Sequence, residues 1–97
     1  MERVTVNAAV APAVPLRIEP NPVADRAEVS FDLASPGHVR IDMYDLTGRA
    51  MRAILDGGME AGPHRVRIET EGLPAGLYIL ELATPGGSTV RPMIVAR

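Results

Sequence analysis

Hydrophobic and polar positions alternate with a period of two in several short segments of this chain, most clearly over residues 39–44. The Val, Ile and Met of this segment fall on one face, and its Arg, Asp and Tyr fall on the other. This alternation is typical of a β-strand with one buried face. Asp45 and Gly48 then predict a turn, because Asp can bond its own backbone and Gly tolerates a positive φ. Residues 50–55 are apolar enough to return as a second strand.

The rest of the chain supplies strands that can cover the apolar face of this hairpin. Segments rich in Pro and Gly separate them at a spacing of about 8–12 residues, and no helical stretch is evident. The pattern therefore predicts an all-β fold of about seven short strands in an antiparallel β-sandwich. Besides the hairpin, the predicted strands are residues 16–19, 27–33, 64–69, 77–82 and 89–96.

Several local signals refine this prediction. Residues 57–58 and 62–63, Gly-Gly and Gly-Pro, are expected to bracket a loop. Apolar residues on both faces of 77–82 indicate a central strand, or one that is partly covered on both faces. Pro92 assigns the last strand to a sheet edge or forces a bulge, and an edge strand offers unpaired backbone groups to a partner. The predicted core includes Ile18, Val29, Phe31, Ile41, Met43, Val66, Ile68, Tyr78 and Leu80.

Composition fits one small globular domain. The chain has 97 residues and a net charge of −2, with basic and acidic residues interspersed, so no nucleic-acid surface is expected. It has no cysteine, which excludes disulfides and thiol catalysis. No apolar run approaches the roughly 20 residues of a membrane span, so membrane insertion is not expected. We interpret residues 1–14 as a linker or flexible arm and residues 15–97 as the domain.

The sequence predicts no catalytic residue, metal site or cofactor. His38 and His64 lack a neighbouring acid and serine that would make either a catalytic base. Asp42, Asp45 and Asp56 lack the dense oxygen-ligand spacing of a calcium loop, so we interpret them as solvated strand and turn acids.

The two tyrosines suggest different roles. Tyr44 is the one aromatic residue expected outside the core, which gives weak support to a sugar-binding platform. Tyr78 follows Leu-Pro-Ala-Gly-Leu, which fits a tyrosine corner, in which the hydroxyl bonds back to the preceding backbone. An ordinary core tyrosine fits that position equally well.

Several motifs, each weak alone, occur in an order that resembles the C-terminal sorting domain, type A, of the type IX (Por) secretion system of Bacteroidetes-like bacteria. That family is similar in turn to the immunoglobulin-like domain of the flagellar hook-capping protein. The resemblance covers about residues 16–97. Its motif residues are Pro20, Asn21 and Pro22; Tyr44, Asp45, Gly48 and Arg49; Gly76 and Tyr78; and Arg91 and Arg97, with arginine at 91 where the family usually has lysine.

The resemblance implies a seven-stranded immunoglobulin-like sandwich that carries no catalytic site. It implies that an N-terminal passenger domain is exported across the outer membrane to the cell surface or the medium. The implied partners are the translocon and a sortase-like peptidase machinery. Two alternatives remain open from the sequence, a carbohydrate-binding or adhesive module and a structural immunoglobulin-like spacer.

Overall fold

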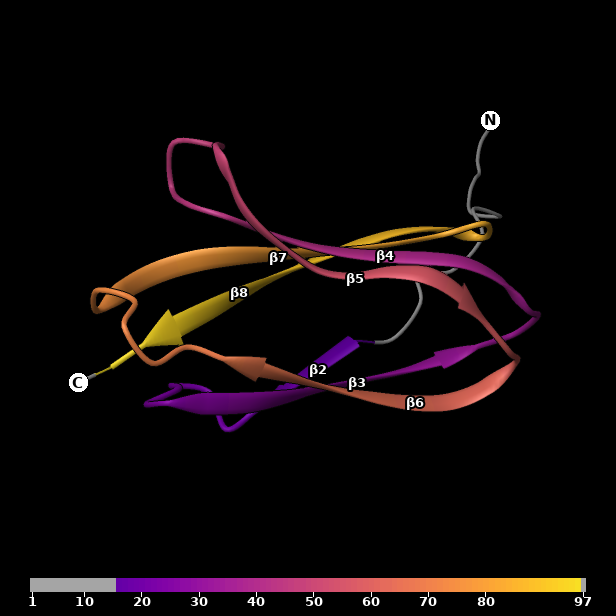
Figure 1. Ribbon diagram of the computed structural model, residues 1–97, viewed down its shortest axis with the longest axis horizontal. Helices are drawn as coiled ribbons and strands as arrows, with labels where there is room; N and C mark the ends of the chain where they lie inside the picture. Colours follow the sequence, from indigo (N-terminus) through magenta and orange to yellow (C-terminus); the bar gives the residue numbers. More distant parts are fainter. Residues whose placement is uncertain (1–15, 97) are drawn as a thin grey trace, which may run out of the picture.

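The computed structural model describes residues 16–96, which form seven strands in two antiparallel sheets that stack face to face (Figure 1). β2 (Leu16–Glu19), β3 (Arg26–Leu33) and β6 (Gly62–Glu69) form a three-stranded sheet in the order β2-β3-β6. β4 (Gly37–Tyr44), β5 (Ala50–Met59), β7 (Gly76–Thr84) and β8 (Gly87–Val95) form a four-stranded sheet in the order β5-β4-β7-β8. This arrangement confirms the predicted all-β sandwich.

The core lies between the sheets and follows the alternation of the sequence. In β3, every second residue from Ala27 to Leu33 is buried, and the residues between them are exposed or half-buried. Eight of the nine residues predicted for the core are buried, and the ninth, Val66, is half-buried and packs against the core. Ile68, two residues further along the same strand β6, is fully buried. Ile41, Met43, Leu80 and Leu82, on the central strands β4 and β7, are fully buried.

The predicted loop between Gly57-Gly58 and Gly62-Pro63 is present but short, because all four bracketing residues belong to strands. β5 continues through Gly57 and Gly58, which lie opposite Val39 and His38 of β4. β6 already begins at Gly62, so only two residues connect the strands as the chain passes from one sheet to the other. The ladder with β4 outweighs the weak strand propensity of the two glycines.

The predicted positions of the last two strands are confirmed. β7 lies between β4 and β8, and β8 is an edge strand. The β7–β8 ladder pairs every residue from Gly76 opposite Val95 to Thr84 opposite Gly87 without a register shift. Pro92 therefore fits in β8 because the strand lies at the sheet edge, and no bulge forms at this position. The predicted arm, residues 1–14, and Arg97 lie outside the described residues, and within residues 16–96 no helix has the length and hydropathy needed to span a membrane.

We expect Leu80→Ala to lower the free energy of unfolding by about 2–5 kcal/mol, because it leaves a cavity at a fully buried position of a central strand. Leu46→Ala is the matched control, because Leu46 is 68% exposed and its truncation should change stability by less than about 0.5 kcal/mol. Urea unfolding of both variants measures the difference. Equal losses would show that Leu80 is not a core residue.

Candidate functional site

The turn between β4 and β5 is organised by the carboxylate of Asp45. Its Oδ1 accepts hydrogen bonds from the Thr47 backbone amide (2.9 Å), the Thr47 hydroxyl (2.6 Å) and the Arg49 amide (3.1 Å). These bonds, the one from the Thr47 hydroxyl foremost, lower the pKa of Asp45 below its ordinary value. Gly48 has a φ of 88°, as its predicted turn role requires. The turn leaves the Arg49 side chain 81% exposed.

Tyr44, at the end of β4, is not the free aromatic surface that the sequence suggested. Its hydroxyl donates to Glu81 Oε1 of β7 at 3.1 Å, and its side chain is half-buried. This hydrogen bond is the main reason that the pKa of Tyr44 is raised. The sugar-platform alternative thereby loses the one aromatic residue that supported it.

The acids considered for calcium do not converge. Arg40 Nε donates to Asp42 at 2.7 Å, and its Nη1 donates to Asp56 at 3.3 Å. His38 Nε2 lies 2.5 Å from the other oxygen of Asp56. Asp45 belongs to the separate turn, and within the described part of the chain no group of three or more acidic or histidine side chains is placed to hold a metal ion.

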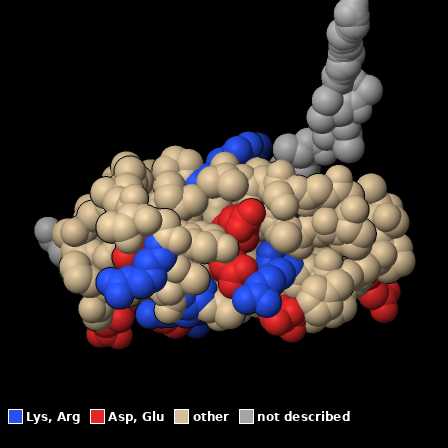
Figure 2. Space-filling view, turned by 90° about the horizontal axis from the view of Figure 1, so that it is seen from above, with Lys and Arg blue, Asp and Glu red and all other residues tan. Residues whose placement is uncertain are grey.

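Figure 2, which views the outer face of the four-stranded sheet, shows charged side chains mainly in its lower half and a broad uncharged area above them.

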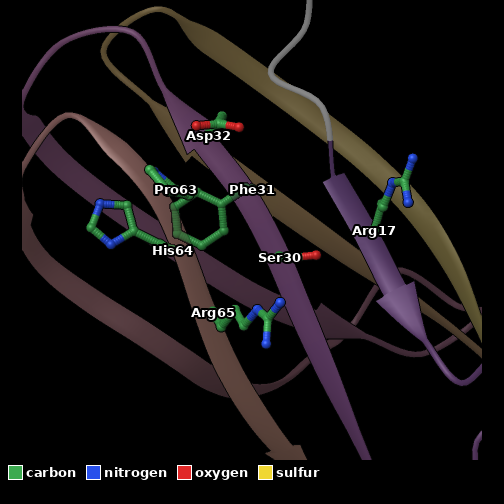
Figure 3. A pocket seen from close by; sticks show the side chains of 7 residues that line it. All are labelled: Arg17, Ser30, Phe31, Asp32, Pro63, His64 and Arg65. Atoms are coloured by element: carbon green, nitrogen blue, oxygen red, sulfur yellow. The ribbon is translucent and has the colours of Figure 1, made fainter.

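A shallow hollow of about 450 Å³ lies on the three-stranded sheet (Figure 3). Strand register places Arg17, Ser30 and Arg65 in one row across its outer face, with the hydroxyl between the two guanidinium groups. His64 is opposite Phe31, and the centres of their rings are 5.5 Å apart. Phe31 belongs to the core and Ser30 to the outer face, so the serine and the histidine do not form a nucleophile and base pair.

Asn21 has a role that the sequence reasoning missed. The Pro20–Pro22 motif does end β2, as predicted, and both of its prolines follow cis peptide bonds. The Asn21 side chain, however, reaches β8, where Nδ2 donates to the Pro92 carbonyl at 3.1 Å and Oδ1 accepts from the Ile94 amide at 3.0 Å. The available signal was a polar side chain between two prolines, but its partners lie more than 70 positions away in the sequence.

Val23 extends this contact along the same edge. Its amide donates to the Ile94 carbonyl at 2.7 Å, and its carbonyl accepts from the Ala96 amide at 2.8 Å. The expectation that β8 offers unpaired backbone groups is therefore wrong from Pro92 to Ala96, although its position at the edge is confirmed.

Tyr78 forms the predicted tyrosine corner. Its hydroxyl donates to the Pro74 carbonyl at 2.6 Å, while its ring is buried, with 6% of the residue exposed. Gly76, two residues before it, has a φ of 155°, which L side chains rarely adopt. The motif thus fixes the entry of the chain into the central strand β7.

Arg91 occupies an unusual place on β8. Alternation puts it on the face of Thr89 and Met93, which are buried, yet Arg91 is exposed. Its Nη1 donates to the Val90 carbonyl at 3.0 Å. A charged side chain on the core-facing side of an edge strand disfavours pairing with another strand.

Most motif residues gather at one end of the sandwich. Tyr44 lies opposite Ile79, and Gly76 lies opposite Val95, so the β4–β5 turn, the start of β7 and the end of β8 are neighbours. The isolated bridge between Val23 and Val95 brings the Pro20–Pro22 segment to the same end, on the left in Figure 1. Arg91 lies further along β8, opposite Leu80. The outer face of β8 adds two exposed apolar side chains, Val90 (50%) and Ile94 (46%).

Comparisons with known proteins agree with this picture. Residues 17–96 match the family model of the secretion system C-terminal sorting domain. No curated protein matches the sequence. The chain is similar in structure to dimeric latent PorU from Porphyromonas gingivalis, with a TM-score of 0.68 and 23% identity over 96% of this chain and 10% of that chain. The chain thus spans about a tenth of PorU, and the likeness supports the fold.

We expect Tyr78→Phe to lower the free energy of unfolding by about 1–2 kcal/mol, because the Pro74 carbonyl loses its donor while the ring stays in place. Tyr44→Phe is the matched control and should cost less, because Tyr44 is only half-buried whereas Tyr78 is buried, so water reaches the Tyr44 hydroxyl more easily. Urea unfolding compares the two variants. If Tyr78→Phe were as stable as the wild type, the corner would contribute nothing to stability.

The turn should respond to acid. Asp45 has a folded pKa below its ordinary value of 3.8, so its ionised form adds stability that is complete above this value. That contribution is lost as the pH falls through the folded pKa. An NMR titration of the Asp45 carboxyl should show the lowered pKa, and the Thr47 amide should shift with it. Titration at or above 3.8 would contradict the role of the Thr47 hydrogen bonds, and Asp45→Asn should abolish the shift of that amide.

Proposed function

Because this chain belongs to the secretion system C-terminal sorting domain family and so acts as a secretion signal of the type IX system, we propose that it directs an N-terminal passenger to the cell surface or the medium. One observation carries this proposal. The match covers residues 17–96, which is nearly the whole described sandwich and not a single motif. The signal is therefore a folded domain, whose surface can be read as a shape.

The family is non-catalytic, and we propose that this domain likewise catalyses no reaction. The geometry of its histidines supports this. His38 is engaged by Asp56, and His64 Nε2 lies 2.6 Å from the Glu60 carbonyl. Neither of these contacts pairs a histidine with a hydroxyl nucleophile.

The partners follow from the sorting role. We propose that the domain interacts with the type IX translocon and a sortase-like peptidase machinery, and that its passenger travels through the periplasm and across the outer membrane. Residues 1–14 would then link the passenger to a sorting unit of residues 15–97. The first segment has no clear period of apolar positions, which supports a linker rather than a second core.

The proposed recognition residues include two groups with different structural roles. Asp45, Gly48, Gly76 and Tyr78 shape turns and strand entry, so they present the surface and do not have to contact a partner. Exposed basic side chains remain available for recognition. They are Arg49, at the motif-bearing end, and Arg91, on β8, and Arg97 belongs to the same proposal from the sequence.

Export of a reporter tests the proposal. The complete chain is fused to the C-terminus of an inert periplasmic protein and expressed in a host with a type IX system. We expect the reporter at the surface or in the medium, and in the periplasm of a mutant host without the translocon. A reporter that stays periplasmic in the competent host, although its sandwich is folded, would refute the sorting role and favour the spacer or adhesive alternatives.

Charge reversal of the exposed arginines locates the signal. Arg49→Glu and Arg91→Glu should each reduce export several-fold. The matched control is Arg17→Glu, which places the same change on the other sheet, opposite Ser30. Exposed substitutions of this kind change stability by about 0.5 kcal/mol or less, so lost export with an unchanged free energy of unfolding would report recognition. Equal export of all three variants would exclude these arginines from the recognised surface.

A further inference from the structure

The outer edge of β8 is defined by which backbone groups point away from β7. The Pro92 carbonyl, both polar groups of Ile94 and the Ala96 amide all bond to residues 21–23. Residues of a strand alternate between its two edges, so the even-numbered residues of β8 direct their backbone groups outward. The missing amide of Pro92 belongs to this outward set. Proline therefore costs the β7–β8 ladder no hydrogen bond, which explains why the register is uninterrupted.

Val23 forms one rung of a parallel ladder on this edge. Its amide bonds to the Ile94 carbonyl and its carbonyl to the Ala96 amide, so the two bonds flank Val95. In a parallel pair, one residue bonds in this way to the neighbours on both sides of its partner. The adjacent rung would flank Met93 and would require a donor for the Pro92 carbonyl and an acceptor for the Ile94 amide.

The Asn21 side chain supplies that adjacent rung. Its Nδ2 donates to the Pro92 carbonyl and its Oδ1 accepts from the Ile94 amide, the two bonds that a peptide backbone would make there. Asparagine suits this place because its short side chain carries both a donor and an acceptor, as a peptide group does. Aspartate lacks the donor, alanine lacks both, and the flanking Pro20 and Pro22 have no amide to offer.

We propose that Asn21 and Val23 together lock the carboxyl-terminal strand in place and close its outer edge, from Pro92 to Ala96, to strand addition. The lock joins the segment between β2 and β3, two strands of one sheet, to the last strand of the other sheet. Arg91 protects one more backbone group of this edge, because its guanidinium donates a hydrogen bond to the Val90 carbonyl. Because the backbone edge is closed, a partner that binds β8 contacts the side chains on the outer face of the strand, such as Val90 and Ile94. This contact with a partner is the second step of the proposal, and it rests on the proposed sorting function.

Amide hydrogen exchange tests the lock in the complete 97-residue chain, without any secretion component. In the wild type, the Ile94 amide should exchange slowly, although it points away from β7. In Asn21→Ala it should exchange about tenfold faster or more, because its acceptor is gone. The Met93 and Val95 amides point toward β7 and serve as references within the strand, and they should change little. Asn7→Ala makes the same chemical change elsewhere in the chain and should leave Ile94 protected.

Asn21→Asp separates the lock from a general loss of structure. Aspartate keeps an acceptor for Ile94 but loses the donor for Pro92, so exchange at Ile94 should fall between the wild type and the alanine variant. This order supports the lock if the Met93 and Val95 amides stay protected, because a general loss of structure would expose them as well. Wild-type exchange at Ile94 as fast as in an exposed loop would overturn it, as would an Asp or Ala variant with unchanged exchange in a folded chain.

Export of the reporter tests the second step and can fail independently. If a partner reads the outer face of β8, Ile94→Glu should reduce export several-fold, and opening the edge with Asn21→Asp should not increase it. Increased export of Asn21→Asp would mean that the partner adds a strand to the opened edge, which would overturn that step. An unexported wild-type reporter would refute the sorting function and leave the exchange result standing.

Discussion

Each sheet of this protein has one apolar face, and neither face is stable in water until the other covers it. Alternate residues of β3, β4, β7 and β8 meet in a single core, and central positions such as Ile41 and Leu80 are fully buried. A chain of this size has little surplus core, so this mutual burial is the constraint on which the turns, the edges and the exposed motifs depend. The motifs are features of a surface that exists only once the two sheets have packed.

A sandwich also leaves edges, and each described edge carries a device that disfavours pairing. The ladder of β5 with β4 is irregular, with register shifts next to Ile41 and Met43 of β4. The edge strand β6 begins with Gly62 and Pro63, and the edge strand β2 is only four residues long. β8 is closed by hydrogen bonds from residues 21–23. These are common ways of preventing edge-to-edge association. A sorting domain built in this way presents folded faces and turns, which is the basis of our proposal that its side chains are recognised.

Local chemistry in the sequence predicted much of this structure. The period of two located the strands, and Asp45 with Gly48 predicted their turn, because the interacting groups are within four residues of one another. Tyr78 was predictable for the same reason, since its partner is Pro74. Long-range pairing was not predictable. From the sequence, Gly57 and Gly58 indicated the start of a loop. In the structure they belong to β5, because they pair with β4. The partners of Asn21 and Tyr44 are 71 and 37 positions away.

The central claim is that the secretion machinery reads the end of the sandwich where the motifs gather, together with β8. Site-specific photo-crosslinking during export tests this most directly, with the crosslinker placed in turn at Arg49, Ile94 and, on the opposite sheet, Arg17. The account predicts adducts with components of the type IX system from Arg49 and Ile94 but not from Arg17. Adducts from Arg17 alone, or from all three positions equally, would contradict it.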